Sequence, residues 1–254
     1  MKRKEEAAVL SQECLSPGIY SMWLETGIAK EASPGQFVSL YSRDGSRLLP
    51  RPISLCEIGK DRIRLVYRVA GKGTKEFSGL EPGDTVEIMG PLGNGFPIKE
   101  TEGKRTLLIG GGIGIPPMVE VARQVPGEKL LVMGYRDSRM FLKKELEDCG
   151  PLFVATEDGS FGTKGTVLDA VRENGLSADV IFACGPLPML RAVKDYAEGH
   201  GILAWISMEE RMACGIGACL ACVCESKEVD GHSHVHNKRI CKDGPVFPAG
   251  EVEF

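Results

Sequence analysis

The chain has 254 residues, of which 43% are apolar and 26% charged, and its formal net charge is -4. This composition is typical of globular proteins with a buried core, and the slightly acidic balance argues against nucleic-acid binding. No apolar run approaches the ~20 residues of a membrane span, and the first residues, MKRKEEAAVL, lack the apolar stretch of a signal peptide. We therefore expect a cytoplasmic protein that binds neither nucleic acid nor a membrane.

Residues 1–100 contain short β-rich segments that are separated by Gly and Pro. They read AAVLSQECL, GIYSMWLET, GQFVSLYS, RPISLCEI, RIRLVYRVA and DTVEIMGPLG, and one short helical segment, TKEFSGL, interrupts them. This pattern predicts a small, six-stranded antiparallel barrel as the first domain.

From about Arg105, buried strands alternate with helices. The strand segments are RTLLIG, KLLVMGY, PLFVATEDG and ADVIFACG, with GILAWIS as the last; the helical segments between them are PPMVEVARQV, MFLKKELEDCG, GTVLDAVREN and LPMLRAVKDYAEGHG. The alternation predicts a doubly wound parallel sheet over residues 101–207. From about Met208, Cys, Gly and short polar segments predominate, so we expect residues 208–254 to form a small third domain.

Four of the nine cysteines lie within residues 214–224. Cys214, Cys219 and Cys222 have the spacing C-x4-C-x2-C, and Cys241 follows after 18 further residues, which is the pattern of plant-type [2Fe–2S] ferredoxins. A disulfide framework is disfavoured because cytoplasmic thiols stay reduced and the number of cysteines is odd. Structural zinc sites usually pair their ligands in two short C-x2–4-C units, whereas here three candidates share one loop. These four cysteines are therefore predicted to hold a [2Fe–2S] cluster.

Two features of the same segment leave alternatives open. Cys224 follows Cys222 by two residues, so that on a strand it points the same way and competes as a ligand. His232, His234 and His236 alternate and would share one face of a strand, which suggests a second metal site. The preferred interpretation is the exposed tip of a hairpin, because no carboxylate or thiol in that segment completes a site.

RPIS (51–54) ends one expected barrel strand, and YRVAGKGT (67–74) ends the next and opens a short helix. Arg51 can bind a pyrophosphate through two parallel hydrogen bonds, and Ser54 offers a hydroxyl. Gly71 and Gly73 allow close backbone approach, and the N–H groups of Gly73 and Thr74 at a helix start can bind an anion.

On a barrel that precedes a dinucleotide domain, these motifs resemble the flavin site of the ferredoxin–NADP reductase superfamily. Ile53 stands where many of these reductases carry an aromatic residue. The resemblance implies FAD bound by Arg51, Pro52, Ile53, Ser54, Val66, Tyr67, Arg68, Gly73 and Thr74.

The segment LLIGGGIGIPPM reads as a strand, a glycine turn and a helix start, at which a phosphate can bind. Its spacing differs from G-x-G-x-x-G followed by an acid and resembles the variant of the same superfamily. A second motif, FACGPLPML, ends the expected fourth strand, at the edge where ligands bind in such sheets. The resemblance implies that NAD(H) binds at Gly111, Gly112, Gly114, Cys184, Gly185 and Pro186.

The resemblance places Cys184 against the nicotinamide; the alternative is a buried thiol that behaves as a small hydrophobe. No histidine lies in the nearby motifs, so we expect no catalytic nucleophile. In GYRDS, Arg136 could accept a 2′-phosphate while Asp137 would repel one. NAD is preferred over NADP mainly through the family resemblance.

Hydride carriers move two electrons, an iron–sulfur cluster moves one, and a flavin does both. The whole chain resembles the electron-transfer subunits of the NAD-dependent (type B) dihydroorotate dehydrogenases of bacteria, through RPISL, YRVAGKGT, GGGIGIPPM, CGPLPML and MEERMACGIGACLACVC…RICKDGPVF. The long histidine-bearing insertion and Cys224 depart from that pattern. The resemblance implies an FMN-containing catalytic partner that oxidises dihydroorotate in pyrimidine biosynthesis, a heterotetramer of two subunits of each kind, and electron flow through the [2Fe–2S] cluster and FAD to NAD⁺.

Two other functions remain open from the sequence. The small subunit of an NADH-dependent ferredoxin:NADP oxidoreductase or sulfide dehydrogenase has the same architecture with a different large partner. A zinc-stabilised interaction module on a degenerate reductase scaffold is the alternative from another class.

Overall fold

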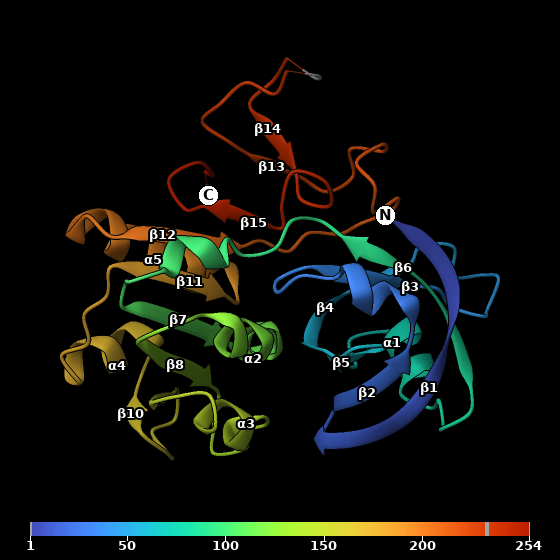
Figure 1. The fold of residues 1–254 in the computed structure, drawn as a ribbon, viewed down its shortest axis with the longest axis horizontal. Coiled ribbons are helices and arrows are strands. Elements are labelled where there is room, and N and C mark those ends of the chain that lie inside the picture. The colour runs from blue at the N-terminus through green and yellow to red at the C-terminus, as the bar shows by residue number, and fades with distance from the viewer. Residues whose placement is uncertain (1, 232–233, 254) are drawn as a thin grey trace.

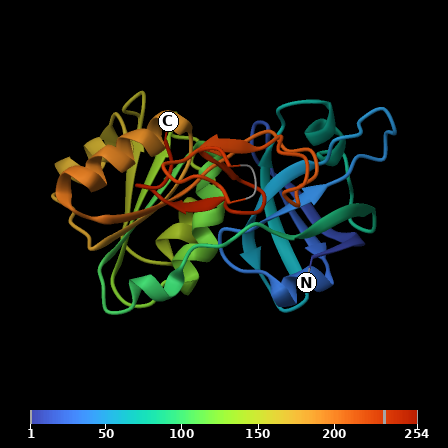
Figure 2. The same cartoon turned by 90° about the horizontal axis from the view of Figure 1, so that it is seen from above.

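The computed structural model describes residues 2–231 and 234–253. Figure 1 shows a barrel beside a helix-covered sheet, with the C-terminal segment above both. In the view from above, that segment lies across the junction of barrel and sheet (Figure 2). Among the described residues, no helix is long and apolar enough to cross a membrane.

The predicted six-stranded antiparallel barrel is confirmed. It closes in the order β1-β2-β5-β4-β3-β6, and the helix α1 (Lys72–Phe77) lies between β5 and β6 in the chain. Short 3-10 turns cover Gly27–Glu31 and Ile98–Thr101. The strands are β1 (Arg3–Ser16), β2 (Ile19–Glu25), β3 (Phe37–Leu40), β4 (Arg51–Ile58), β5 (Arg62–Arg68) and β6 (Thr85–Leu92).

The doubly wound sheet is also confirmed, with the order β10-β9-β8-β7-β11-β12-β15. Its parallel strands are β7 (Thr106–Gly111), β8 (Lys129–Tyr135), β9 (Leu152–Thr156), β10 (Thr163–Lys164), β11 (Val180–Cys184) and β12 (Leu203–Ser207). Apolar residues of α2 (Ile115–Gln124) and α3 (Lys143–Glu147) belong to one core cluster, and those of α4 (Val167–Glu173) and α5 (Leu187–His200) to another. The helices therefore cover the two faces of the sheet in pairs.

Two details of this sheet differ from the sequence-based expectation. FACG ends the fifth strand of this sheet in chain order, whereas the sequence predicted the fourth. The count was one short because the two-residue strand β10 is too short to show a hydrophobic pattern. The helix expected over residues 140–150 spans only Lys143–Glu147, and it begins after Leu142, whose φ of 60° is left-handed and not helical.

The C-terminal segment is joined to both neighbours. β13 (Val223–Glu225) pairs with β14 (Asn237–Arg239) in a hairpin, whereas β15 (Val246–Pro248) runs antiparallel to β12 at the edge of the large sheet. On the barrel side, the Asn94 amide donates to the carbonyl oxygen of Asp243 at 2.9 Å. The cysteine-bearing loop between these anchors is thereby held against the barrel.

A buried charge network fixes the barrel to α2. The Glu57 carboxylate accepts hydrogen bonds from Arg64, at 2.5 Å, and from Arg123 of α2, and Glu120 of α2 accepts from the backbone N–H of Ile58 at 2.9 Å. Glu57 and Arg64 are both less than a tenth exposed. Because breaking one partner of such a pair leaves an uncompensated buried charge, the network favours one fixed placement of the barrel against the sheet.

Candidate cofactor-binding sites

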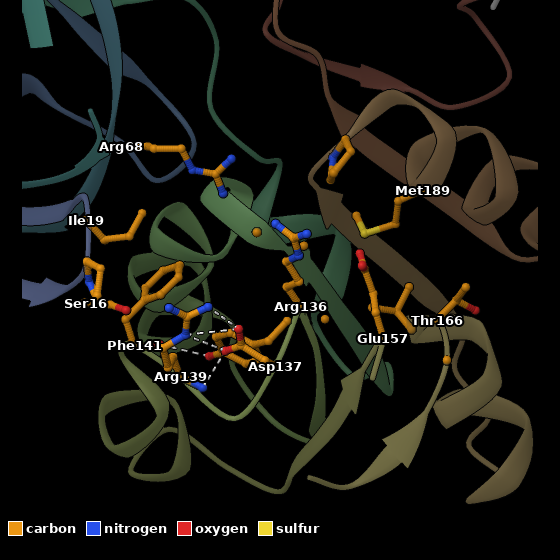
Figure 3. Close-up of a pocket in the computed structure, with 18 residues that line it drawn as sticks. Ser16, Ile19, Arg68, Arg136, Asp137, Arg139, Phe141, Glu157, Thr166 and Met189 are labelled. Carbon is orange, nitrogen blue, oxygen red and sulfur yellow. Dashed lines mark hydrogen bonds and ion pairs between the residues drawn. The ribbon is translucent and has the colours of Figure 1, made fainter. Parts of the chain in front are cut away.

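A cavity of about 600 Å³ lies between the barrel and the carboxyl ends of the parallel strands. In Figure 3, Arg68 reaches it from the barrel side, while Arg136, Asp137 and Glu157 reach it from the sheet side. The edge at which parallel strands end is where ligands bind in such sheets. The cavity therefore has the position and size of a dinucleotide site.

The glycine turn after β7 forms one wall of this cavity through Gly111 and Gly112. Gly112 has a φ of +54°, and a Cβ at Gly114 would lie 2.4 Å from the carbonyl oxygen of Cys184. A Cβ at Gly111 would lie 2.5 Å from the sulfur of Met189. A residue larger than glycine at position 111 or 114 would clash with α5 or β11. Glycine at these positions therefore lets the turn pack closely, with its backbone at the cavity wall.

The second predicted motif divides between wall and core. Pro186, at the start of α5, lines the cavity, whereas Cys184 is buried behind it at the end of β11 and hydrogen-bonds Ser207 of β12. A Cβ at Gly185 would lie 2.4 Å from Cε of Met189. Desolvation by burial raises the pKa of Cys184 to about 12, so this thiol stays protonated and is not a nucleophile.

An ion pair between Asp137 and Arg139, which the sequence did not predict, lies just after β8. Arg139 donates to both carboxylate oxygens of Asp137, with Nε 3.0 Å from each, and its backbone N–H donates at 2.9 Å. The side-chain hydrogen bond from Arg139 is the main reason why the pKa of Asp137 falls to about 2. Arg136 lines the same cavity and has no hydrogen bond or ion pair with the described residues. The spacing Asp-x-Arg at residues 137–139 is the feature of the sequence that could have predicted this ion pair.

We expect Asp137→Asn to shift the nucleotide preference toward NADPH. Loss of the carboxylate frees Arg139 and removes a repulsive charge, so the ratio of kcat/KM for NADPH to that for NADH should rise about tenfold, or ~1.4 kcal/mol. In the wild type this ratio should not change between about pH 7.5 and 9, because a carboxylate with a pKa of about 2 is ionised there and a 2′-phosphate, whose second pKa is about 6, is ionised as well. Asp158→Asn is the control, since Asp158 bonds Ser160 and does not line the cavity; an equal change in both variants would contradict the assignment.

The flavin motif lies where two barrel strands separate. Residues 51–54 of β4 pair with β3, but the ladder between β4 and β5 ends at Leu55 and Leu65. Residues 66–68 of β5 pair only with β2. Two unpaired backbone edges therefore face each other at RPIS and VYR, and their amide groups are available to a planar, hydrogen-bonding ring.

Arg51 is positioned over the start of α1. A Cβ at Gly73 would lie 2.7 Å from Nε of Arg51 and 3.0 Å from Nη2, so only glycine leaves room for the guanidinium there. The Thr74 hydroxyl closes the turn by accepting from the backbone N–H groups of Ala70 and Gly71 at 2.9 and 3.2 Å. Arg51 donates to the carbonyl oxygen of Leu49 and has no ion pair among the described residues. An unpaired guanidinium above a glycine-rich turn fits a pyrophosphate.

The other predicted flavin residues differ in what they present. Pro52, Ile53 and Ser54 are half-buried, and Arg68 is exposed. Tyr67 is buried in the barrel, where its hydroxyl donates to Gln12 at 3.1 Å, so only its backbone faces the unpaired edge.

The cysteine loop directs backbone N–H groups at sulfur. Cys214 Sγ accepts from Ala218 at 3.3 Å and from Cys219 at 3.4 Å, and Cys241 Sγ accepts from Gly217 at 3.1 Å. Gly217 has a φ of +84°, a conformation that L side chains rarely adopt. Hydrogen bonds of this kind stabilise thiolates and tune iron–sulfur clusters.

The four predicted ligands are arranged as two pairs. The Cys214 thiol hydrogen-bonds that of Cys219, and the Cys222 thiol hydrogen-bonds that of Cys241. A [2Fe–2S] cluster with four cysteine ligands offers two irons, whereas a structural zinc needs all four sulfurs around one ion. Within residues 2–231 and 234–253, no three His, Cys, Asp or Glu side chains are grouped to hold one metal ion. The two thiol pairs match the two pairs of ligands that a two-iron cluster takes.

Cys224 lies in β13, two residues after Cys222. Its half-buried side chain packs against the core cluster that contains Cys222 and Cys241, and desolvation by burial raises its pKa to about 11. Cys222 remains the predicted ligand because it fits the C-x4-C-x2-C spacing and its sulfur accepts from the Cys241 backbone N–H at 3.4 Å.

His234 and His236 lie in the predicted hairpin, but not on a strand. His234 and His236 are exposed and precede β14, which begins at Asn237, so the shared strand face was a wrong premise. His236 Nδ1 lies 3.0 Å from the carbonyl oxygen of Lys227. His232 lies outside the described residues.

The closed barrel, the dinucleotide cavity and the thiol loop define a pyridine-nucleotide-linked oxidoreductase of the ferredoxin reductase type with an added iron–sulfur domain. Family models agree: residues 209–253 match the iron–sulfur cluster binding domain of dihydroorotate dehydrogenase B, and residues 108–195 match the oxidoreductase NAD-binding domain. The chain is 41% identical over 263 residues to the dihydroorotate dehydrogenase B (NAD(+)) electron transfer subunits of Bacillus mycoides and Bacillus cereus, covering 99% of both chains in each case. The chain belongs to this family of electron transfer subunits, as the sequence motifs predicted.

Solved structures support the same fold. The structure of an NADH-dependent reduced ferredoxin-NADP oxidoreductase aligns with a TM-score of 0.86 at 28% identity, covering 97% of this chain and 89% of the other. The ferredoxin NADP⁺ reductase of Neisseria gonorrhoeae, with bound FAD and NADP, aligns with a TM-score of 0.66 at 16% identity, covering 82% and 94% of the two chains. At that identity the second likeness concerns the fold alone.

Proposed function

We propose that the chain passes electrons from a dihydroorotate-oxidising partner through a [2Fe–2S] cluster and FAD to NAD⁺. The observation that carries this proposal is the spatial order of the three sites, with the barrel in contact with both the cysteine loop and the nucleotide cavity. On one side, a Cβ at Gly215 of the cysteine loop would lie 3.2 Å from Met89 and Leu92 of the barrel. On the other side, a Cβ at Gly112 in the turn of the nucleotide cavity would lie 3.6 Å from Nη2 of the barrel residue Arg68. Bound FAD would exchange hydride on the nucleotide side and single electrons on the cluster side.

In this proposal each part of the chain holds one redox group. Residues 1–100 bind FAD, residues 101–207 bind NAD(H), and residues 208–254 bind the cluster. Arg51 and Gly73 hold the pyrophosphate, the backbone edges at 51–54 and 66–68 hold the flavin ring, and the glycine turn at 111–114 holds the nucleotide phosphates. No side chain of these sites is assigned as a catalytic acid or base.

The partner in this proposal is an FMN-containing catalytic subunit, in a cytoplasmic heterotetramer that serves pyrimidine biosynthesis. Ile216, Leu220 and Val223 are 47%, 42% and 37% exposed beside the cysteine ligands. An apolar surface at the cluster is suited to a protein partner, and it would bring the cluster close to the partner's flavin. The relatives' name, electron transfer subunit of dihydroorotate dehydrogenase B, supports this choice.

The second candidate is the small subunit of a ferredoxin-linked oxidoreductase. The alignment with the NADH-dependent reduced ferredoxin-NADP oxidoreductase covers nearly all of both chains and favours it. Its 28% identity is lower than the 41% shared with the dihydroorotate dehydrogenase B subunits, so the first candidate is preferred.

We expect the isolated chain to reduce artificial acceptors with NADH but not to oxidise dihydroorotate, because no base is placed over a pyrimidine site. Purified together with the dihydroorotate-oxidising subunit of the same cell, it should co-elute and reduce NAD⁺ with dihydroorotate. Stopped-flow absorbance would follow the order, with cluster bleaching before FAD reduction. Dihydroorotate oxidation by this chain alone, or lack of association with that subunit, would overturn the proposal and favour the ferredoxin-linked function.

A further inference from the structure

Ser39, in the middle of β3, carries a buried hydroxyl without a partner. The residue has no exposed surface, and its Oγ makes no hydrogen bond with the described residues. A buried hydroxyl left unpaired costs roughly 1–3 kcal/mol, so such a group in a native protein usually has a ligand or another function.

The alternation of β3 directs Ser39 away from the barrel interior. Val38 and Leu40 belong to the core inside the barrel, whereas Phe37 belongs to the cluster of side chains that contains Cys222 and Cys241. Successive side chains of a strand point to opposite faces, so Ser39 shares the outer face of Phe37. The C-terminal segment covers this face.

The nearest part of that cover is the cysteine loop. A Cβ at Gly215, the residue after Cys214, would lie 3.3 Å from the Ser39 hydroxyl oxygen. The other groups around this Cβ, Leu92 Cδ1 and Met89 Cε, are both at 3.2 Å and cannot serve as strong hydrogen-bond acceptors. The polar group is therefore enclosed by apolar atoms and by the loop that carries the first ligand.

Ser39 also borders the flavin motif. In the barrel it pairs with Pro52 of RPIS on one side and with Met89 on the other. Ser39 therefore lies between the residue that contacts the thiol loop and a residue of the predicted flavin motif.

We propose that the Ser39 hydroxyl donates a hydrogen bond to a sulfur atom on the Cys214 side of the iron–sulfur site and raises the reduction potential of the cluster. This inference rests on the proposed [2Fe–2S] function of the four cysteines. Reduction adds negative charge to the cluster, and a donor at sulfur stabilises that charge. Of the three atoms nearest to a Cβ at Gly215, the Ser39 hydroxyl oxygen is the one that can donate a hydrogen bond.

The test is Ser39→Ala in the full chain, purified anaerobically with its partner. We expect unchanged iron and acid-labile sulfide, altered g values in the electron paramagnetic resonance spectrum of the reduced cluster, and weaker reduction of the cluster in a redox titration. The equilibrium constant for reduction should fall about tenfold, which is ~59 mV for one electron. Iron content separates this inference from the proposed function. A wild-type chain without a cluster would refute both, whereas a chain with its cluster can refute the role of Ser39 alone.

Thr106→Val is the matched control. Thr106 is also fully buried, and its hydroxyl also lacks a partner, but it lies at the start of β7, far from the cysteine loop in the fold. The control should leave the potential and the spectrum unchanged. Full iron content with an unchanged potential and spectrum in Ser39→Ala, or an equal shift in Thr106→Val, would overturn the role of Ser39.

Discussion

Cys222→Ser should abolish the iron–sulfur cluster, whereas Cys224→Ser should retain it. The Cys222 thiol is buried and hydrogen-bonds Cys241, and its sulfur also accepts from the Cys241 backbone N–H at 3.4 Å. Cys224, two residues further along the chain, lies outside the C-x4-C-x2-C spacing. Removing one of four thiolates leaves an iron with an incomplete ligand set, so loss of iron should be nearly complete rather than graded.

Iron and acid-labile sulfide, measured after anaerobic purification, would report the outcome directly. Cys214→Ser, Cys219→Ser and Cys241→Ser should behave like Cys222→Ser, and all should keep FAD because the barrel site is separate. Retained iron in Cys222→Ser together with loss in Cys224→Ser would reverse the assignment. A colourless wild-type protein that contains zinc would instead support the interaction module.

The sequence predicted the barrel and the parallel sheet because their strands are apolar and long enough to show a period. Leu107, Leu108 and Ile109 form a continuous buried run in β7, as expected for a strand covered on both faces. β10 and β15 were missed for the opposite reason. Each has at most three residues, and each forms only because an existing sheet edge accepts its backbone hydrogen bonds.

The site residues divide in the same way. Motifs that act through the backbone, such as the glycine turn at 111–114 and the cysteine loop, are visible in the sequence because glycine and cysteine are chemically distinctive. Ser39 and Arg139 are common residues, and their environment follows from which distant segment covers them. The alternation of β3 indicates that Ser39 points opposite to Val38, but only the packed structure places Gly215 above it.

Arg51→Ala should release FAD while leaving the cluster in place. Within the described part of the chain, the Arg51 guanidinium has no carboxylate partner and lies over the start of α1, so a bound pyrophosphate would take its free donors. A charged hydrogen-bonded contact contributes roughly 1.5–3 kcal/mol, which corresponds to a loss of about one to two decades in FAD affinity. Fluorescence titration of the deflavinated protein would give the dissociation constant, and iron content would confirm that the cluster domain is intact.

Arg43→Ala is the control for charge alone. Arg43 comes from the loop that precedes β4, but its guanidinium donates to Thr85 of β6, at 2.6 and 3.1 Å, and not toward the start of α1. Gly73→Ala provides the complementary change, since its Cβ would lie 2.7 Å from Nε of Arg51 and displace the guanidinium without removing its charge. If position matters as well as charge, Gly73→Ala should weaken FAD binding toward the level of Arg51→Ala. Tight FAD binding in Arg51→Ala would show instead that Arg51 is a surface charge.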